Sequence, residues 1–237
     1  MTDTETTRTI VGILGNIISF FLFLSPVPTF ATIIKDKAVH NFKPHPYVAT
    51  VLNCMMWSFY GLPFVKPDSI LVLTINAIGL AMEIVYVIIF FTYSPNKLRI
   101  KITVALLCEI GFMAAVVLIT MLCFHTTGKR SMFVGILCII FNIIMYASPL
   151  AVMKMVIKSK SVKYMPFTLS LANFLNGCIW VVYAFLKFDI NIFLPNCLGT
   201  MSGLVQLILY ACYYKTTRWD EEDEEPKDPE VEMTGRP

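Results

Sequence analysis

The sequence has few charged side chains. Asp, Glu, Lys and Arg make up 15% of its 237 residues, whereas 57% are hydrophobic. This balance is too apolar for a soluble domain, and the small net charge of +3 indicates no role with nucleic acids. The composition instead predicts an integral membrane protein that is surrounded by the lipid bilayer.

Histidine is scarce, and the cysteines lack a metal-binding spacing. The histidines His40, His45 and His125 fall between the apolar stretches, and no nucleophile–base or metal-ligand grouping is visible. The sequence therefore argues against an enzyme and against a metal or other cofactor. All seven cysteines lie within apolar stretches without a CxxC pair, so we expect small core residues and no disulfides.

The chain contains seven long apolar stretches. A bilayer core of roughly 30 Å requires about 20 apolar residues per helix. Stretches of about this length cover residues 10–34, 46–64, 69–92, 102–124, 132–157, 166–186 and 190–214. The first is too long for a signal peptide and lacks a small-residue cleavage site, so we expect it to remain as a membrane span.

Basic residues predict the orientation of these spans. If the N-terminus is outside, the cytoplasmic segments hold twelve Lys and Arg residues and the opposite side holds five. The positive-inside rule therefore favours an extracellular N-terminus, residues 1–9, and a cytoplasmic C-terminus. Residues 215–237 carry nine acidic residues between Asp220 and Glu232, which is typical of a disordered cytoplasmic tail; a partner-binding tail is the alternative.

The apolar stretches form an internal repeat. Residues 12–39 align with residues 135–162 at an offset of 123, and "IIKDKAV" meets "VIKSKSV". Beyond the next loop we expect an offset of 120, which pairs Pro46 with Pro166, Tyr60 with Trp180, and Asn76 with Asn196. Residues 10–92 and 132–214 are thus two three-helix repeats, and the linker helix 102–124 gives both the same orientation. Two parallel repeats can enclose a central cavity, as in alternating-access transporters.

The chain resembles the plant SWEET sugar transporters across nearly all of residues 9–214. The segments that carry the resemblance, in order, are "GNIISFFLFLSPVPTF", "PYVATVLNCMMWSFYG", "TINAIGLAMEIVYV", "MYASPLAVMKMVIKSKSVKYMPFTLSL" and "LPNCLGTMSGLVQLILY". The resemblance implies an all-α integral membrane fold of seven transmembrane helices, arranged as two parallel three-helix bundles (3+1+3) joined by a linker helix. It also implies facilitated sugar movement down a gradient and a place in the plasma membrane. Because family members often associate, it leaves a homo-oligomer open.

Asn76 and Asn196 are the strongest candidates for binding a substrate. Each lies about 10 Å below the outer surface by the rise of a helix. An amide facing lipid would be unsatisfied, so each faces a neighbouring helix or a cavity. Hydrogen bonding between helices, worth about 1 kcal/mol, is one interpretation. The symmetric pair favours the other, contact with sugar hydroxyls, and the resemblance places the substrate pair here.

Trp57 and Trp180 lie well inside the second helix of each repeat. A membrane tryptophan usually packs or anchors at the interface, but an indole face can also cover the apolar face of a pyranose. The resemblance supports a pocket role for both, and adds Ser19, Leu22, Asn53, Asn142, Met145 and Asn176. Relatives that favour disaccharides tend to have smaller residues at several of these positions. The asparagines here therefore predict a hexose such as glucose in preference to sucrose.

Two further groups of polar residues stand out. The resemblance implies that Tyr60 and Asp189, one from each repeat, hydrogen-bond across the outer mouth and form an extracellular gate. Glu83 and Glu109 are intramembrane carboxyls, which often have a function. Because no basic residue lies in the span of Glu83, we expect structural hydrogen bonds for both, and a proton relay at Glu83 is the alternative.

Four prolines recur as two matched pairs. Pro26 and Pro149 lie in the first helices of the repeats, and Pro46 and Pro166 lie in the second. A proline removes a backbone donor and can kink a membrane helix. Recurrence in pairs favours hinges below the sugar site over a static bundle, as the resemblance also implies. Pro28 has no counterpart, because Ala151 stands at the equivalent position.

The sequence leaves several functions to compare. Short loops, duplicated halves and the lack of DRY-like or NPxxY-like elements argue against a seven-span receptor. A proton-coupled PQ-loop carrier of another small solute and a sucrose-transporting member of the same family remain as alternatives. The sequence favours a bidirectional, facilitative transporter, a uniporter of monosaccharides such as glucose.

Overall fold

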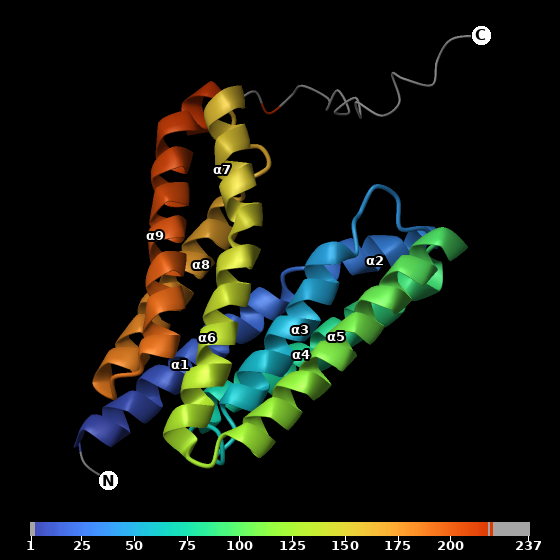
Figure 1. Cartoon of the computed structure of the whole chain (residues 1–237). Helices are drawn as coiled ribbons and strands as arrows, with labels where there is room; N and C mark the ends of the chain where they lie inside the picture. Colours follow the sequence, from blue (N-terminus) through green and yellow to red (C-terminus); the bar gives the residue numbers. More distant parts are fainter. Residues whose placement is uncertain (1–2, 218, 220–237) are drawn as a thin grey trace.

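Nine α-helices and one short 3-10 helix make up the part of the chain that the computed structural model describes, residues 3–217 and 219 (Figure 1). The first repeat contains α1 (Asp3–Leu24), α2 (Val27–Asp36), α3 (His45–Tyr60) and α4 (Ile70–Tyr93), and α5 (Asn96–Cys123) follows as the linker. The second repeat contains α6 (Thr127–Met145), α7 (Ala147–Ser159), α8 (Phe167–Leu186) and α9 (Ile190–Tyr213), before the 3-10 helix Tyr214–Thr216. Most of the predicted acidic tail lies outside the described residues.

Six segments of the described chain are long and apolar enough to cross a membrane, counting α1 with α2 and α6 with α7 as single interrupted spans. The seventh predicted span, 46–64, corresponds to α3, which has 16 residues and ends at Tyr60. At about 1.5 Å per residue it is roughly 24 Å long. Because α3 packs against α4, α5 and α6, neighbouring helices cover much of its surface. It completes the 3+1+3 arrangement of seven transmembrane helices.

The helices of each repeat pack in the same lateral order. In the first repeat α4 contacts both α1 and α3, and in the second α9 contacts both α6 and α8. The third helix of each repeat therefore lies between the first two. Across the repeats, α1 packs on α8 and α3 packs on α6, which are equivalent contacts under a two-fold exchange. The linker α5 contacts α3, α4 and α6, so it lies mainly against the first repeat.

The two repeats share a core at only one end of the bundle. We call the end where α1 begins the N-terminal end, and the end reached by α2 and α7 the C-terminal end (Figure 1). At the N-terminal end one hydrophobic cluster joins the repeats, with Trp57 and Tyr60 on α3 and Trp180 and Tyr183 on α8. Toward the C-terminal end each repeat has its own cluster, around Phe30 in the first and around Val156 in the second. The repeats accordingly diverge toward that end.

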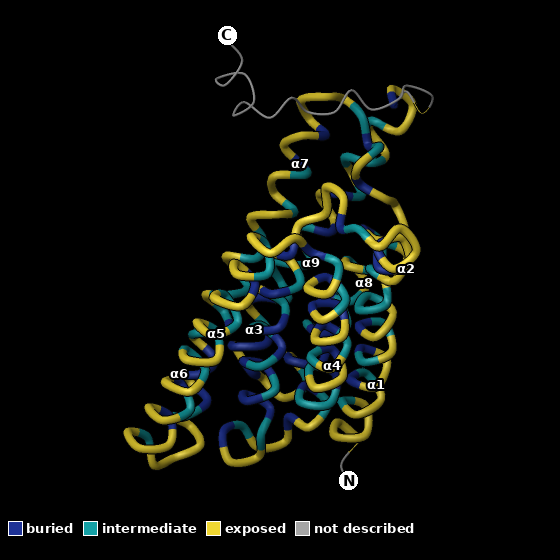
Figure 2. The backbone as a smooth tube through the Cα atoms, turned by 90° about the vertical axis from the view of Figure 1, so that its right-hand side faces the viewer, coloured by how far each residue is buried: buried dark blue, intermediate teal, exposed yellow. Residues whose placement is uncertain are grey.

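Apolar side chains cover the outside of the bundle, as expected for a surface in contact with lipid. Figure 2 shows buried positions along α3 and exposed positions along much of α5 and α6. Leu107 and Leu122 of α5 are 63% and 72% exposed. The expectation that all cysteines are core residues is wrong for three of them: Cys108, Cys123 and Cys212 are exposed on this outer surface. Small, weakly polar thiols are tolerated both in the core and on the lipid-facing surface.

The first helix of each repeat is broken close to its matched proline. Pro26 cannot donate to the Leu22 carbonyl, and the chain turns there between α1 and α2. The hydroxyl of Tyr86 donates to the Phe23 carbonyl oxygen at 2.9 Å, which satisfies an acceptor at this break. In the second repeat Pro149 cannot donate to the Met145 carbonyl, and α6 ends at that residue. The breaks between α1 and α2 and between α6 and α7 thus both lie where a proline has no backbone N–H to donate to the preceding turn.

Candidate functional site

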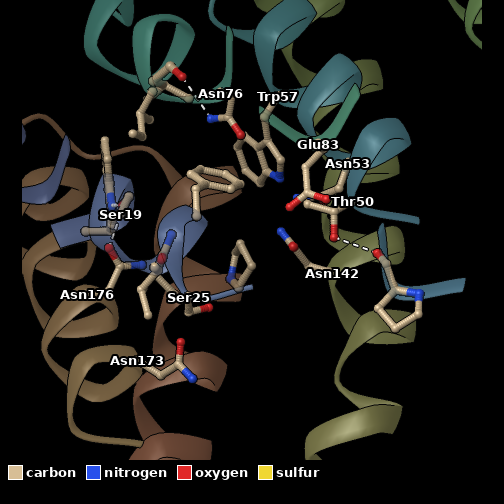
Figure 3. Close-up of a pocket in the computed structure, with 18 of the residues that line it drawn as sticks. Ser19, Ser25, Thr50, Asn53, Trp57, Asn76, Glu83, Asn142, Asn173 and Asn176 are labelled. Carbon is tan, nitrogen blue, oxygen red and sulfur yellow. Dashed lines mark hydrogen bonds between the residues drawn. The ribbon is translucent and has the colours of Figure 1, made fainter. Parts of the chain in front are cut away.

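A cavity of about 480 Å³ lies between the two repeats (Figure 3). Its lining extends from Ile192 near the shared core to Pro26 and Pro46 near the C-terminal end. It includes nine of the ten residues for which the sequence predicts substrate contact, namely Ser19, Leu22, Asn53, Trp57, Asn76, Asn142, Asn176, Trp180 and Asn196. Met145, the last residue of α6, does not line this cavity. The volume is within the usual range for small-molecule sites.

Asn76 and Asn196 occupy matching places on the third helices. Each is the seventh residue of its helix, α4 or α9. The amide nitrogen of Asn76 donates to the Val72 carbonyl at 2.8 Å, and that of Asn196 donates to the Ile192 carbonyl at 2.7 Å. These bonds hold both amides on their own helices. Each side chain still has its carbonyl oxygen and a second N–H to offer a ligand.

A chain of hydrogen bonds fixes one wall of the cavity, between α1 and α8. The indole N–H of Trp180 donates to the Ser19 hydroxyl at 3.1 Å, and that hydroxyl donates to the Asn176 side-chain oxygen at 2.6 Å. Because Trp180 is only 6% exposed, its position depends on this contact as well as on packing. The amide nitrogen of Asn176 stays free to donate into the cavity.

The structure corrects one correspondence between the repeats. Trp57 contacts Tyr60 edge-on, with ring centroids 5.4 Å apart at 74°, and Trp180 contacts Tyr183 in the same way, at 5.2 Å and 73°. The counterpart of Tyr60 is therefore Tyr183, and the expected match of Tyr60 with Trp180 is wrong. The offset is 120 at the matched prolines that begin the second helices, 123 along their cavity-lining part up to Tyr60 and Tyr183, and 120 again on the third helices. The last change arises because nine residues separate Tyr60 from α4, whereas six separate Tyr183 from α9: the last three residues of α8 and a three-residue loop.

Asn173 is a lining residue that sequence reasoning missed. It precedes Asn176 by three residues and Trp180 by seven on α8, so all three share one helix face. Thr50, Asn53 and Trp57 repeat this spacing on α3 and also line the cavity. This shared spacing is the signal in the sequence that indicates Asn173.

Aromatic side chains from the broken helices cover glycines on the third helices. A Cβ atom at Gly79 would lie 2.3 Å from the Phe23 ring, and one at Gly199 would lie 2.8 Å from the Tyr146 hydroxyl. Tyr146 also donates to the Pro195 carbonyl oxygen at 2.6 Å. Phe23 and Tyr146 both line the cavity, and neither was among the candidates from sequence. Each glycine therefore lets a helix break lie directly against an asparagine-bearing helix.

The intramembrane carboxyls do not have the bonds that the sequence led us to expect. In the described part of the chain, Oε2 of Glu83 and Oε2 of Glu109 are buried without a hydrogen-bond partner. The two differ in place, because Glu83 lines the cavity and Glu109 on α5 does not. Structural hydrogen bonding at these atoms is thus not confirmed.

At the N-terminal end, Tyr60 and Asp189 meet as a direct pair. The Tyr60 hydroxyl lies 2.9 Å from Oδ1 and 2.7 Å from Oδ2 of the Asp189 carboxylate, to which it donates. Tyr60 is fully buried and Asp189 is 3% exposed. The amide of Asn191 donates to the Tyr60 hydroxyl at 3.3 Å. This contact joins the two repeats at the N-terminal end.

Charged residues surround this contact. The Lys66 ammonium lies 3.2 Å from the Asp189 carboxylate, so the buried charge has a counter-ion from the other repeat. Lys187 and Asp68 form a second ion pair between the repeats, but both side chains are more than half exposed. The Lys187 ammonium, which is hydrogen-bonded to Asp68, holds the pKa of that carboxyl below its usual range. Exposed pairs contribute little to stability, whereas removing one partner of a buried pair leaves an uncompensated charge, so losing the contact between Lys66 and Asp189 should have the larger effect.

The four matched prolines lie toward the C-terminal end. Pro26 and Pro46 line the cavity, whereas Pro149 and Pro166 do not. Pro26 precedes α2, Pro149 is the third residue of α7, Pro46 is the second residue of α3, and Pro166 immediately precedes α8. Each therefore lies at or near a helix start.

Comparison with known proteins gives the family. Residues 9–98 and 132–218 each match the family described as "Sugar efflux transporter for intercellular exchange". The chain belongs to the SWEET family. It is 64% identical over 225 residues to the bidirectional sugar transporter SWEET5 of Arabidopsis thaliana, covering 95% of this chain and 94% of that protein. It is 59% identical to SWEET4 of the same plant, over 94% of this chain and 88% of that protein.

A solved SWEET structure has the same fold. The described chain superimposes on a eukaryotic SWEET transporter with a TM-score of 0.86 and 39% identity, covering 90% of this chain and 99% of that one. The two stretches that match the SWEET family contain the two three-helix repeats, and the gap between them contains most of α5. The protein is therefore a multi-pass integral membrane protein with SWEET architecture.

Proposed function

We propose that this SWEET chain is a bidirectional facilitative transporter that carries monosaccharides, glucose among them, by alternating access. The observation that carries the proposal is the cavity between the repeats, lined by the matched amides of Asn76 and Asn196. The Tyr60–Asp189 contact joins the repeats at the N-terminal end, where a gate would have to form. The cavity offers polar groups for sugar hydroxyls and indole faces for the sugar ring. Relatives named bidirectional sugar transporters support the substrate class.

The same geometry suits weak, reversible binding. A carrier must release its ligand on both sides, and a millimolar dissociation constant corresponds to only about −4 kcal/mol. A few amide contacts and one stacking surface are enough for this. Among the described residues, the repeats share a hydrophobic core at one end, and each has its own cluster at the other. The two repeats can therefore move relative to each other, closing one end and opening the other, while each repeat stays folded. We accordingly propose transport without a bound cofactor or catalytic step.

The proposal also includes the orientation of the protein in the membrane. Up to residue 218, the segments predicted to be cytoplasmic hold twelve basic residues, against five on the opposite side, which favours a cytoplasmic position for the C-terminal end. The conformation described is then inward-facing, with the Tyr60–Asp189 gate closed on the extracellular side. We propose the plasma membrane as its location, and the resemblance to the family keeps a homo-oligomer as a prediction.

Transport by the purified protein in liposomes tests the proposal. Uptake and efflux of radiolabelled glucose, fructose and sucrose are measured at two pH values, with empty liposomes as the control. We expect glucose to equilibrate in both directions at similar rates at the two pH values. Strong dependence on a proton gradient would favour the proton-coupled carrier, faster sucrose than glucose would favour the disaccharide alternative, and no sugar flux would refute the proposal.

The sugar preference depends on the volume of the lining side chains. Asn142 and Asn176 both line the cavity, so replacing both with serine removes volume and hydrogen-bonding groups. We expect the ratio of sucrose to glucose uptake to rise several-fold in the Asn142→Ser, Asn176→Ser variant, because a disaccharide needs the extra space. Competition uptake with both sugars measures this ratio, and an unchanged ratio in a well-expressed variant would count against a size-based preference.

The proline positions support a hinge role. Alanine at Pro26 or Pro149 restores a donor for the last turn of the helix before the break, and alanine at Pro46 or Pro166 frees a φ angle that proline fixes, so each variant changes the bend at its helix start. We expect each single variant to lower glucose exchange by a factor of roughly five to ten at normal expression, since a change of about 1 kcal/mol in the bending free energy is enough. Pro28→Ala is the matched control, because Pro28 has no counterpart in the second repeat. Undiminished transport in all four variants would contradict the hinge.

A further inference from the structure

Glu83 has an unusual place in the cavity. It lies on α4, two helical turns beyond Asn76 toward the C-terminal end, and it is 4% exposed. In Figure 3 its carboxyl group points into the space bordered by Trp57 and Asn142. Of the side chains that line the described cavity, Glu83 has the one carboxyl group, and no Lys, Arg or His is among them. Such a group within a membrane usually has a functional reason.

The carboxyl group lacks partners on the protein side. Its Oε2 atom has no hydrogen-bond partner among residues 3–217 and 219, and the same is true of Oδ1 of Asn53, which also lines the cavity. Tyr47 and Cys54 on α3 and Tyr86 on α4 are ionisable groups within electrostatic reach of the Glu83 carboxyl. None of these is a cation. Two buried acceptor atoms beside the cavity are therefore left unsatisfied. Rotation of the two side chains toward a ligand with hydroxyl donors would remove the cost of leaving these atoms unpaired.

The second repeat has no equivalent group. The counterpart of Glu83 is Gly203, at the offset of 120 that applies to the third helices. A Cβ atom at Gly203 would already come within 2.9 Å of the Phe174 Cα atom, because α8 and α9 lie in direct contact there. No larger side chain fits in that position. At the level of Asn76 and Asn196, each repeat therefore supplies a polar side chain to the cavity. At the level of Glu83, the third helix of the first repeat supplies one, and that of the second repeat does not.

We infer that Glu83, with Asn53 beside it, forms an acceptor subsite that binds hydroxyl groups of the sugar on the first-repeat side of the cavity. The inference deepens the proposed function and depends on it. A carboxyl group offers two oxygens, which suits the two neighbouring hydroxyls of a sugar diol. Because the second repeat has glycine at this position, the subsite gives the bound sugar one preferred orientation.

Liposome uptake with Glu83 variants tests the subsite. Glu83→Met keeps the length and removes both acceptors, whereas Glu83→Gln keeps one acceptor oxygen. Glu109→Met is the matched control, because Glu109 has an equally unpartnered oxygen but lies away from the cavity. We expect the half-saturating glucose concentration to rise roughly ten-fold in Glu83→Met and about two- to three-fold in Glu83→Gln, as for one lost hydrogen bond. The half-saturating glucose concentration of Glu109→Met should stay near that of the original chain.

Monodeoxyglucose analogues separate contact from folding. In the original chain, removal of the hydroxyl bound by Glu83 should weaken competition with glucose about ten-fold, and in Glu83→Met that penalty should disappear. Equal weakening by every analogue in both proteins would overturn the subsite, as would a Glu83→Met variant that behaves like the original. If Glu83→Met does not insert into the membrane, the same monodeoxyglucose analogues are tested on Glu83→Gln. A pattern of competition identical to that of the original chain would then also overturn the subsite. Absence of glucose uptake by the original chain would instead refute the proposed function.

Discussion

Replacing Asn76 or Asn196 with alanine should lower glucose exchange roughly ten-fold, and replacing both should lower it roughly a hundred-fold. Each amide is held by its own helix through Val72 or Ile192 and offers its remaining groups to the cavity. A lost hydrogen bond to a ligand costs about 1 to 1.5 kcal/mol, and two sites on opposite repeats should add nearly independently. Initial rates of counterflow in liposomes, at equal amounts of inserted protein, measure the effect.

Asn16 provides the matched control for this pair. It is also an intramembrane asparagine, but its amide donates to the Thr74 hydroxyl at 2.9 Å and it does not line the cavity. Asn16→Ala should therefore keep most of the exchange rate, apart from any loss of inserted protein. If Asn76→Ala and Asn196→Ala resemble Asn16→Ala, the amides are contacts between helices, and the substrate role is wrong.

Replacing Asp189 with asparagine should open the N-terminal end and slow transport about ten-fold. The change removes the charge that the Tyr60 hydroxyl and the Lys66 ammonium share in a buried place. Charge-assisted hydrogen bonds are about twice as strong as neutral ones, so roughly 1.4 kcal/mol or more of the closed state's stability is lost. A carrier that cannot keep one end closed spends less time in the state that releases sugar at the other.

Thiol labelling gives a second measurement of the same gate. Ile192 lies one turn into α9, 2% exposed and lining the cavity, so a cysteine there should react slowly with a reagent added at the N-terminal end. The labelling is done with Cys108, Cys123 and Cys212 replaced by serine. In Ile192→Cys, Asp189→Asn the reaction should speed up several-fold.

Asp68→Asn is the control for the gate, since it removes a carboxylate at the same end that pairs with Lys187 in an exposed place. Exposed ion pairs are worth about 0 to 1 kcal/mol, so this variant should label and transport almost as the original does. Asparagine also tolerates the left-handed backbone of Asp68, at φ 59°. Similar effects of the two substitutions would refute a specific role for the Tyr60–Asp189 contact.

The contrast between these two carboxylates shows where sequence reasoning reached its limit. Both Asp68 and Asp189 lie in short loops at the same end, and family resemblance alone singled out Asp189. The counter-ion Lys66 was not predicted because it comes from the other repeat than Asp189. The amide of Asn191 was not predicted because its partner, the Tyr60 hydroxyl, also lies across the boundary between the repeats. The mismatch of Tyr60 with Trp180 has a similar origin, since the extra residues after α3 become visible only when the ends of the helices are known.

The sequence by itself determined the membrane location, the two repeats with their linker, and the pair Asn76 and Asn196. Burial in lipid depends on each stretch being apolar, and a repeat is a property of residue order, so neither needs knowledge of neighbours. Only the tertiary structure decided that α4 lies between α1 and α3, that Tyr183 is the counterpart of Tyr60, and that Glu83 lines the cavity with one oxygen unpartnered by any described residue. These three features depend on which helices are neighbours and on how each helix is rotated about its axis. Helices that are apolar on nearly every face have no polar and apolar sides, so their sequences do not reveal which face points to which neighbour.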